Sequence, residues 1–387
     1  MKERISERVR NLEQSQIRNM SIECDKIGGI NLSQGICSLP LPPVLAEEAK
    51  AAIDGGKNHY TRYDGISELR EALAGKLAGY NGVQANPETD IVVTSGSTGA
   101  FYCTCMALLN PGDEVILFEP YYGYHEYTLK ALDMVPVYIK LTPPEWSFQP
   151  EEIERAVTAH TRAILINTPA NPSGKVFSEK ELELLAEICI RYDLLVFTDE
   201  IYEYIVYDGF SHISPGAFKN IQDRVVTISG YSKTFSITGW RVGYCACREE
   251  LARPIGCAND LVYVCAPSPL QVGVSRAIAR LPDSFYGSLR GQYQRKRDLL
   301  CGALREASLT PYVPQGAYYV LADISGIPGD TSREKAMYLL EKTGVAVVPG
   351  SAFYRSGGEN LARLCFAKDD QELEQACERL QKLKFLL

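Results

Sequence analysis

The sequence is poor in the features that mark membrane, disulfide-rich and nucleic-acid-binding proteins. Its 387 residues contain no apolar run of about 18 residues, the length a membrane-spanning helix needs. The twelve cysteines include no C-x-x-C pair and the four histidines are scattered, so neither a zinc site nor a disulfide framework is expected. Lys and Arg number 40 against 48 Asp and Glu, a net charge of −8 without a dense basic stripe. Nucleic-acid binding is therefore not expected either.

The N-terminal stretch MKERISERVRNLEQ also lacks the apolar core of a signal peptide. Together with cysteines placed in apolar segments, this predicts a cytoplasmic protein with buried, reduced thiols. The apolar share of 45% and charged share of 23% are those of a globular protein, which excludes disorder, collagen and coiled coil. A chain longer than roughly 250–300 residues exceeds one hydrophobic core, so two domains are expected.

Between about residues 90 and 246, short apolar, often β-branched runs alternate with helical patterns, which indicates an α/β fold. One helix is expected at 178–191, with Ser178 as its N-cap. Strands separated by helices predict a mostly parallel sheet covered on both faces. The expected strands are 91–94, 114–118, 135–139, 163–166, 194–198, 225–229 and 241–246.

After about residue 285 the pattern changes to that of a smaller α+β domain. Helices are expected at 284–307, 333–343 and 370–383, and short strands at 345–348 and 362–366. We predict a large domain over 45–290, and a small domain that combines 1–44 with 291–387.

Polar side chains follow three of the expected strands. Asp199 and Tyr202 come after one strand, Asn171 after the preceding strand, and Lys233 after the next, with Arg241 eight residues beyond the lysine. Ligands of open α/β sheets bind beyond the carboxyl ends of the strands. The sequence therefore predicts that an acid, a phenol, an amide, a lysine and an arginine meet at one edge of the sheet.

The segment Gly96-Ser97-Thr98-Gly99, between a strand and a helix, suits a phosphate at a helix N-terminus. Arg241 could add a charge-assisted contact to the same phosphate. Neither G-x-x-x-x-G-K-[ST] nor a G-x-G-x-x-G after a strand is present, which argues against a P-loop and a dinucleotide site. One phosphate, one amine and one buried acid suit pyridoxal 5′-phosphate, which forms a Schiff base with a lysine and needs a carboxylate at its pyridine nitrogen.

Eight segments then occur in a characteristic order over nearly the whole chain: HYTRYDGISELREAL, VTSGSTGA, LNPGDEVILFEPYY, NTPANPSG, TDEIY, SKTFSITGWRVGY, VPGSAF and LARLCFA. In this series the sequence resembles the class I/II aminotransferases, pyridoxal-phosphate enzymes of fold type I related to aspartate and kynurenine aminotransferases. The resemblance implies a large domain with a mostly parallel seven-stranded sheet, and a homodimer with shared active sites. No metal is expected.

The resemblance also implies roles for individual residues. Lys233 corresponds to the Schiff-base lysine that shuttles the proton, and Asp199 to the partner of the pyridine nitrogen. Tyr202 and Asn171 correspond to donors to the phenolic oxygen of the cofactor. Tyr122 corresponds to the aromatic ring stacked on the pyridine, with Tyr121 as the alternative.

The remaining expected contacts concern the phosphate and the substrate. The phosphate would be held by Ser97, Thr98, Gly99, Ser232 and Arg241, and by Tyr60 of a neighbouring subunit. The substrate carboxylate would be held by Arg363, with Asn171 and Gly35 beside it. The chain departs from the aspartate enzyme at Gly230, where that enzyme often has a phosphate-binding serine; Ser232 is the expected substitute.

The expected reaction moves the amino group of an L-amino acid, with a neutral or aromatic side chain or aspartate, to a 2-oxo acid. The aromatic preference rests on Tyr60, Tyr63, Tyr122 and Ile36. A β-lyase acting on cysteine S-conjugates or cystathionine is the alternative on the same fold. A cofactor-sensing transcription regulator is disfavoured, because only about 30 residues precede Asn31, too few for its DNA-binding domain.

Overall fold

A computed structural model describes residues 5, 6, 8 and 15–386 of the chain. Its main sheet has seven strands in the order β2-β8-β7-β6-β5-β3-β4. β8 runs antiparallel to both neighbours, and all other pairs are parallel. This confirms the predicted α/β class. The strands are β2 (Ile91–Ser95), β3 (Glu114–Glu119), β4 (Val135–Lys140), β5 (Thr161–Asn167), β6 (Leu195–Asp199), β7 (Val225–Gly230) and β8 (Val242–Ala246).

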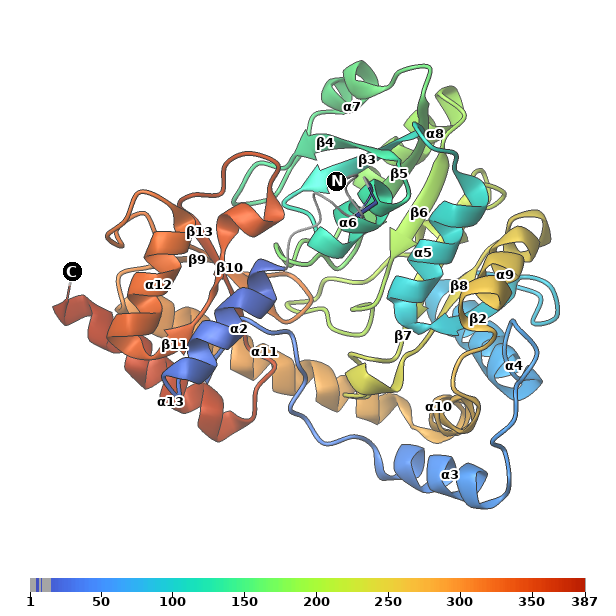
Figure 1. Ribbon diagram of the computed structural model, residues 1–387, viewed down its shortest axis with the longest axis horizontal. Coiled ribbons are helices and arrows are strands. Elements are labelled where there is room, and N and C mark those ends of the chain that lie inside the picture. Colours follow the sequence, from blue (N-terminus) through green and yellow to red (C-terminus); the bar gives the residue numbers. More distant parts are fainter. Residues whose placement is uncertain (1–4, 7, 9–14, 387) are drawn as a thin grey trace.

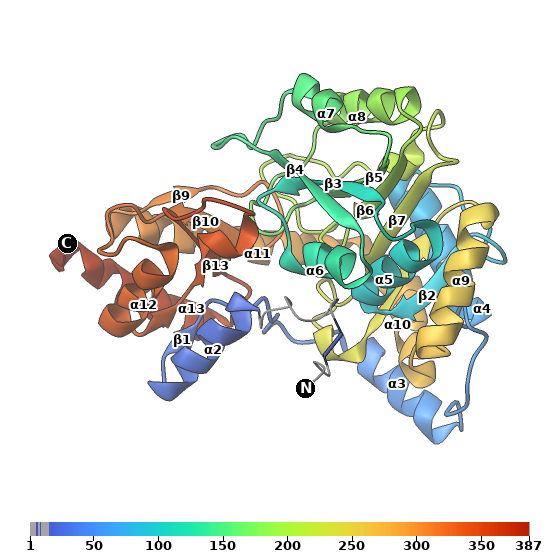
Figure 2. The ribbon, with the colours of Figure 1, turned by 45° about the horizontal axis from the view of Figure 1, so that its top comes forward.

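Helices cover both faces of this sheet because successive side chains of a strand point to opposite faces. On β3, Val115 packs in the same apolar cluster as α5 (Gly96–Leu108), whereas Ile116 packs in the cluster that contains α8 (Glu179–Arg191). Figure 2 shows the strands as a layer between α8 on one side and α5 and α6 on the other. The runs of apolar residues in the sequence are thus strands buried on both faces.

A second sheet is antiparallel, with the order β12-β13-β10-β9. In addition, β1 pairs in parallel with β11, so a strand near residue 30 lies beside the C-terminal part of the chain. Figure 1 shows α2 (Gln16–Lys26) against the same part. The strands are β1 (Ile30–Asn31), β9 (Thr310–Tyr312), β10 (Tyr319–Asp323), β11 (Val345–Ala346), β12 (Val348–Pro349) and β13 (Leu361–Cys365).

The predicted division into two domains stays a prediction, and its boundary at 290 falls inside the continuous helix α11 (Asp283–Glu306). The other α-helices are α3 (Pro43–Asp54), α4 (Ser67–Lys76), α6 (Gly123–Ala131), α7 (Pro150–Ala156), α9 (Glu249–Tyr263), α10 (Ser268–Arg280), α12 (Ser332–Thr343) and α13 (Asp370–Gln381). Short helical segments are η1 (Leu77–Asn81), η2 (Pro215–Ala217), η3 (Thr238–Trp240), η4 (Gly350–Phe353) and η5 (Lys382–Phe385).

The predicted start of α8 is confirmed, because the Ser178 side chain accepts from the backbone N–H of Glu181 and the Glu181 carboxylate accepts from that of Ser178. Within the described part of the chain, no helix is both long and apolar enough to cross a bilayer.

A buried polar network lies directly after β6. Ligand atoms of Glu200, Glu203 and His212 lie within 4.8 Å of one another, a spacing that a cation could use. However, Glu203 already accepts from the Lys76 ammonium at 2.5 Å, and Glu200 contacts His212 at 2.8 Å. Further donors to the two carboxylates are Asn81, Thr198, Ser214 and Ser229. We therefore assign the cluster as an ion-pair network.

Replacing Lys76 by Met is expected to cost about 3–5 kcal/mol of unfolding free energy, because it leaves the buried Glu203 carboxylate without its cation. Burial alone raises the pKa of Glu203, but Lys76 and the other partners outweigh it, and the net pKa is below the ordinary value. In the wild type this contribution is present above the unfolded pKa and is lost only as pH falls through the folded pKa.

Without Lys76 the pKa shift of Glu203 changes direction. Burial then raises the pKa, and the carboxyl takes up a proton in mild acid. The loss of stability should therefore be larger at pH 8 than at pH 5 in urea unfolding. Lys180→Met, at an exposed position of α8, is the control. Equal losses at both pH values would contradict the assignment.

Candidate active site

A cavity of about 400 Å³ opens at the carboxyl ends of β5, β6 and β7. The strand register explains its place, since Asn167 is paired with Asp199, and Asp199 with Ile228 of the next strand. The cavity is lined by eleven of the predicted residues: Gly35, Ser97, Thr98, Tyr122, Asn171, Asp199, Tyr202, Ser232, Lys233, Arg241 and Arg363. Residues from both sheets and from α2 thus meet around one space.

At one end of the cavity, Arg241 lies against the N-terminus of α5. Gly96 has φ +75°, and a Cβ there would lie 2.3 Å from Nη2 of Arg241, so only glycine allows this approach. Arg241 itself has φ +56°, and its Nη1 donates to the carbonyl of Thr238 at 3.0 Å. Ser97 and Thr98 belong to the first turn of α5, whose N–H groups have no partner within the helix. Hydroxyls, free N–H groups and a guanidinium together form an anion-binding cradle.

The structure gives a physical reason for Gly230. This residue pairs with Gly243 across β7 and β8, and a Cβ on Gly230 would lie 3.0 Å from the Gly243 Cα and 3.1 Å from the Val242 carbonyl oxygen. A serine at 230 would therefore crowd β8. Ser232, two residues later, lines the cavity instead.

Asp199 stands at the end of β6 and is held by two contacts. Its Oδ2 lies 2.9 Å from Nε2 of the buried His125, and its Oδ1 accepts from the Ile201 N–H at 3.3 Å. Sequence reasoning missed His125, since nothing in its spacing along the chain points to a strand end 74 residues away. The contact orients the carboxylate within the cavity.

Of the two adjacent tyrosines, Tyr122 lines the cavity, and burial raises the pKa of its hydroxyl far above the ordinary value. Its ring meets that of His125 edge-on, with the centroids 5.3 Å apart. Tyr121 packs against Tyr138 and is not part of the cavity lining.

Arg363 is a buried guanidinium, 1% exposed, that projects from β13. It donates to Oδ1 of Asn171 at 2.9 Å and to the Ser33 carbonyl at 2.5 Å, while its Nε has no partner. Within the described residues no carboxylate forms an ion pair with it. Burying a cation without an ion-pair partner is costly, so the place of Arg363 in the cavity lining favours an anionic ligand there.

The amine of Lys233 donates to the carbonyl of Gly35 at 3.3 Å and lies 5.6 Å from the centre of the Tyr318 ring. The hydroxyl of Tyr202 donates to that of Tyr319 at 3.1 Å. Burial raises the pKa of Tyr202 well above its ordinary value, so the phenol remains protonated and able to donate. Tyr319, which also lines the cavity, is another residue that the motifs did not signal.

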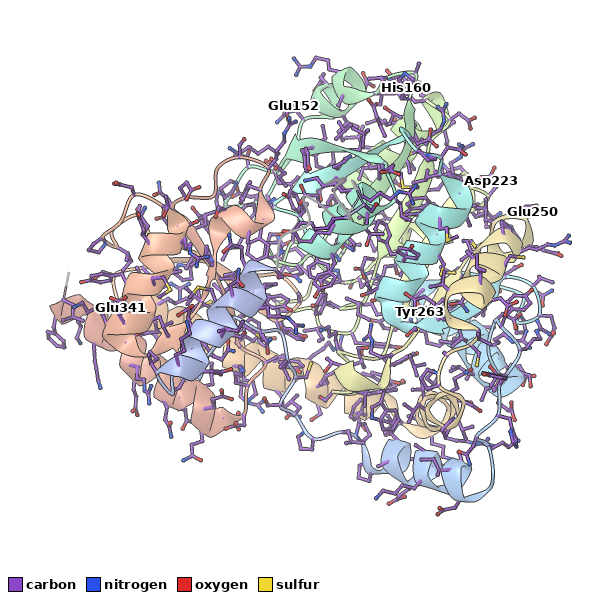
Figure 3. The ribbon with its side chains drawn as sticks, viewed as in Figure 1. Glu152, His160, Asp223, Glu250, Tyr263 and Glu341 are labelled. Atoms are coloured by element: carbon purple, nitrogen blue, oxygen red, sulfur yellow. The ribbon has the colours of Figure 1, made fainter. Side chains whose placement is uncertain are left out.

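Three of the residues that the sequence predicted for the site lie outside the cavity lining: Gly99, Tyr60 and Tyr63. Gly99 is buried in α5, and a Cβ there would lie 3.3 Å from the Tyr263 ring at the end of α9, which is labelled in Figure 3. A larger residue at position 99 would therefore require the Tyr263 ring to shift. Tyr60 is 84% exposed, and its expected contact across a dimer stays a prediction.

The family described as aminotransferase class I and II matches residues 27–380. The chain belongs to this family. The aminotransferase is 34% identical to kynurenine–oxoglutarate transaminase 3 of Rattus norvegicus over 96% of its own length and 89% of the relative's. It is 33% identical to aromatic-amino-acid aminotransferase 2 of Thermococcus litoralis over 98% of both chains.

Among solved structures, N-succinyldiaminopimelate aminotransferase from Mycobacterium tuberculosis matches the aminotransferase with a TM-score of 0.95 and 34% identity, covering 98% of this chain and 100% of that one. The predicted family, fold type and cofactor are thereby confirmed: the protein is a transaminase of fold type I that uses pyridoxal phosphate. The relatives favour transamination of amino acids over the β-lyase alternative.

Proposed function

We propose that this aminotransferase takes the amino group from an L-amino acid with a neutral or aromatic side chain and transfers it to a dicarboxylic 2-oxo acid, using Lys233. The observation that carries the proposal is the joint presence of the Lys233 amine, the Asp199 carboxylate and the unpaired Arg363 guanidinium around one cavity. These three groups match an aldehyde, a ring nitrogen and a substrate carboxylate.

The residues present fit pyridoxal phosphate. The cradle of Arg241 and the first turn of α5 suits its phosphate, and the oriented carboxylate of Asp199 suits its ring nitrogen. When bound, this cofactor supplies an aldehyde that joins to amines and a ring that accepts the electrons of the broken Cα–H bond.

Each of the other side chains then has a task at a stated atom. Arg363 holds the α-carboxylate of the substrate and so fixes the position of Cα. The Lys233 amine would serve as the general base and acid that takes up the proton of the substrate Cα and gives it back. Because Oδ1 of Asn171 accepts from Arg363, its Nδ2 is left to donate to the phenolic oxygen of the cofactor, together with the hydroxyl of Tyr202.

The proposal includes a homodimer with shared sites. Leu261, Val262, Tyr263 and Val264 form a run of exposed apolar residues at the end of α9, and Leu261 is 76% exposed. Exposed apolar patches of this kind mark protein contacts. They support a subunit interface beside α5, to which the exposed Tyr60 would also contribute. We also propose a cytoplasmic location, which the twelve free thiols support.

Arg18 supports a dicarboxylic acceptor. Among the described residues, the cavity lining contains four basic side chains, Arg18, Lys233, Arg241 and Arg363, and one carboxylate, Asp199. Three of the four have a proposed partner: Arg241 the cofactor phosphate, Lys233 the cofactor aldehyde and Arg363 the substrate α-carboxylate. The side chain of Arg18, on α2, is exposed and forms no ion pair or hydrogen bond with the described residues, although its backbone N–H donates to the Ser15 carbonyl. It is therefore available for a second carboxylate at the far end of the substrate.

A panel of half-reactions tests this proposal by following the absorbance of the bound cofactor as it is converted to its amine form and back. We expect aromatic and neutral L-amino acids as donors and 2-oxoglutarate as an acceptor. In Arg18→Met, the KM for 2-oxoglutarate should rise about tenfold through loss of a charge-assisted contact, while the KM for phenylpyruvate stays within twofold.

Lys26→Met, also on α2 but outside the cavity lining, is the matched control. An unchanged KM for 2-oxoglutarate in Arg18→Met would remove Arg18 from the proposal. Turnover of cystathionine to pyruvate and ammonia, without an oxo acid and faster than transamination, would overturn the function itself. Sedimentation of the same preparations reports the subunit number.

A further inference from the structure

We infer that Tyr319 is a positioning residue that links the cofactor side of the site to the substrate side. Its hydroxyl holds the phenol of Tyr202 in its donating orientation, and its ring holds the guanidinium of Arg363. The inference rests on the proposed function, because it concerns how the two groups assigned there are kept in place.

The strand register brings Tyr319 to this position. It begins β10 opposite Cys365 of β13, whereas Arg363 lies opposite Leu321, so Tyr319 and Arg363 are diagonal neighbours on the sheet. Diagonal neighbours lie within reach of aromatic and long side chains. The Arg363 Cζ lies 4.2 Å from the centre of the Tyr319 ring, a cation–π contact in a buried setting.

The Tyr319 hydroxyl is placed for a relay of hydrogen bonds. It lies 3.1 Å from the Tyr202 hydroxyl, and Tyr319 is only 2% exposed. A phenol has one hydrogen to donate. If Tyr202 gives that hydrogen to the phenolic oxygen of the cofactor, Tyr319 becomes the donor to Tyr202, and a chain of two such bonds strengthens both.

The absence of a side chain at Gly35 leaves room for the Tyr319 hydroxyl. A Cβ at Gly35 would lie 1.9 Å from the Tyr319 hydroxyl oxygen, so any other residue would displace it. The Gly35 carbonyl accepts from the amine of Lys233 at 3.3 Å. One tyrosine therefore touches the phenol, the guanidinium and the backbone that contacts the lysine.

Tyr319→Phe tests the hydroxyl because it keeps the ring. A pH titration of the cofactor's absorbance in the reconstituted enzyme, without substrate, should show the apparent pKa of the cofactor–lysine linkage raised by about 0.5 unit. The reason is that a weaker donation from Tyr202 leaves the phenolic oxygen more negative, so the neighbouring nitrogen holds its proton more tightly. The KM values should stay within twofold.

Tyr319→Leu also removes the ring, and should in addition raise the KM of donor and acceptor about tenfold through Arg363. Tyr312→Phe, which removes a hydroxyl from the neighbouring strand β9 outside the cavity, is the control and should leave the titration unchanged. A thermal melt checks that each variant is folded.

A Tyr319→Phe titration identical to that of the wild type would overturn the inference. Borohydride reduction of the same samples distinguishes a failure of the Tyr319 inference from a failure of the proposed function. If the cofactor is fixed to Lys233 and the titration is unchanged, only the role of Tyr319 is wrong. If Lys233 carries no label, the proposed function fails as well.

Discussion

Replacing Lys233 by Ala is expected to abolish transamination, with a fall in turnover of at least about 10⁴-fold. Among the described residues, Lys233 is the one lysine in the cavity lining. In the proposed function, its loss removes both the covalent attachment and the group that moves the proton from Cα. No neighbouring side chain can replace it, because the other cations of the lining are guanidiniums, which do not give up a proton near neutral pH. Stopped-flow absorbance with an aromatic donor measures the remaining rate.

The control for this variant is Lys219→Ala, at an exposed position away from the cavity, which should retain full activity. Reduction with borohydride followed by mass spectrometry of peptides should place the cofactor on Lys233 in the wild type and leave Lys233→Ala unlabelled. Substantial residual transamination in the variant would assign the proton transfer to another group.

Replacing Asp199 by Asn is expected to lower kcat by about 10³-fold with a smaller effect on KM, because stabilisation of charge in the transition state is lost. The amide is nearly isosteric but carries no negative charge, so it cannot keep a proton on the ring nitrogen. His125 still contacts the side chain, and the geometry is therefore largely retained. Steady-state kinetics with the preferred donor separates kcat from KM.

Asp193→Asn provides a matched control near the opposite end of the same strand, where the side chain is 94% exposed. It should leave kcat unchanged. A further check uses a cofactor analogue methylated at the ring nitrogen, whose positive charge needs no proton. In a second variant, Asp199→Ala, this analogue should restore part of the activity. A kcat of Asp199→Asn within tenfold of the wild-type value would contradict the role assigned to Asp199.

Much of the architecture follows from local pattern. The seven expected strands of the main sheet are present as β2 to β8 within a few residues, and the capping box of α8 starts where Ser178 predicts. Such features depend on the spacing of apolar and polar residues over one or two turns, which a single sequence displays. The polar residues that follow β5, β6 and β7 can likewise be recognised from their place directly after an apolar run.

Other features could not be derived in this way because they join distant parts of the chain. Tyr202 meets Tyr319 across 117 positions and Arg363 meets Asn171 across 192. The antiparallel insertion of β8 between β2 and β7 is likewise decided by packing. The same strand order gives a reason for Gly230, since a serine there would crowd β8.

By itself, the sequence determined the class of fold, the family and the chemical types gathered at the strand ends, because residue type and periodicity encode these locally. Only the tertiary structure decided which of those groups share a cavity, that His125 holds Asp199, and that Tyr319 stands between Tyr202 and Arg363. The physical reason is that side-chain contacts depend on strand order and register, which are set by the packing of the whole chain.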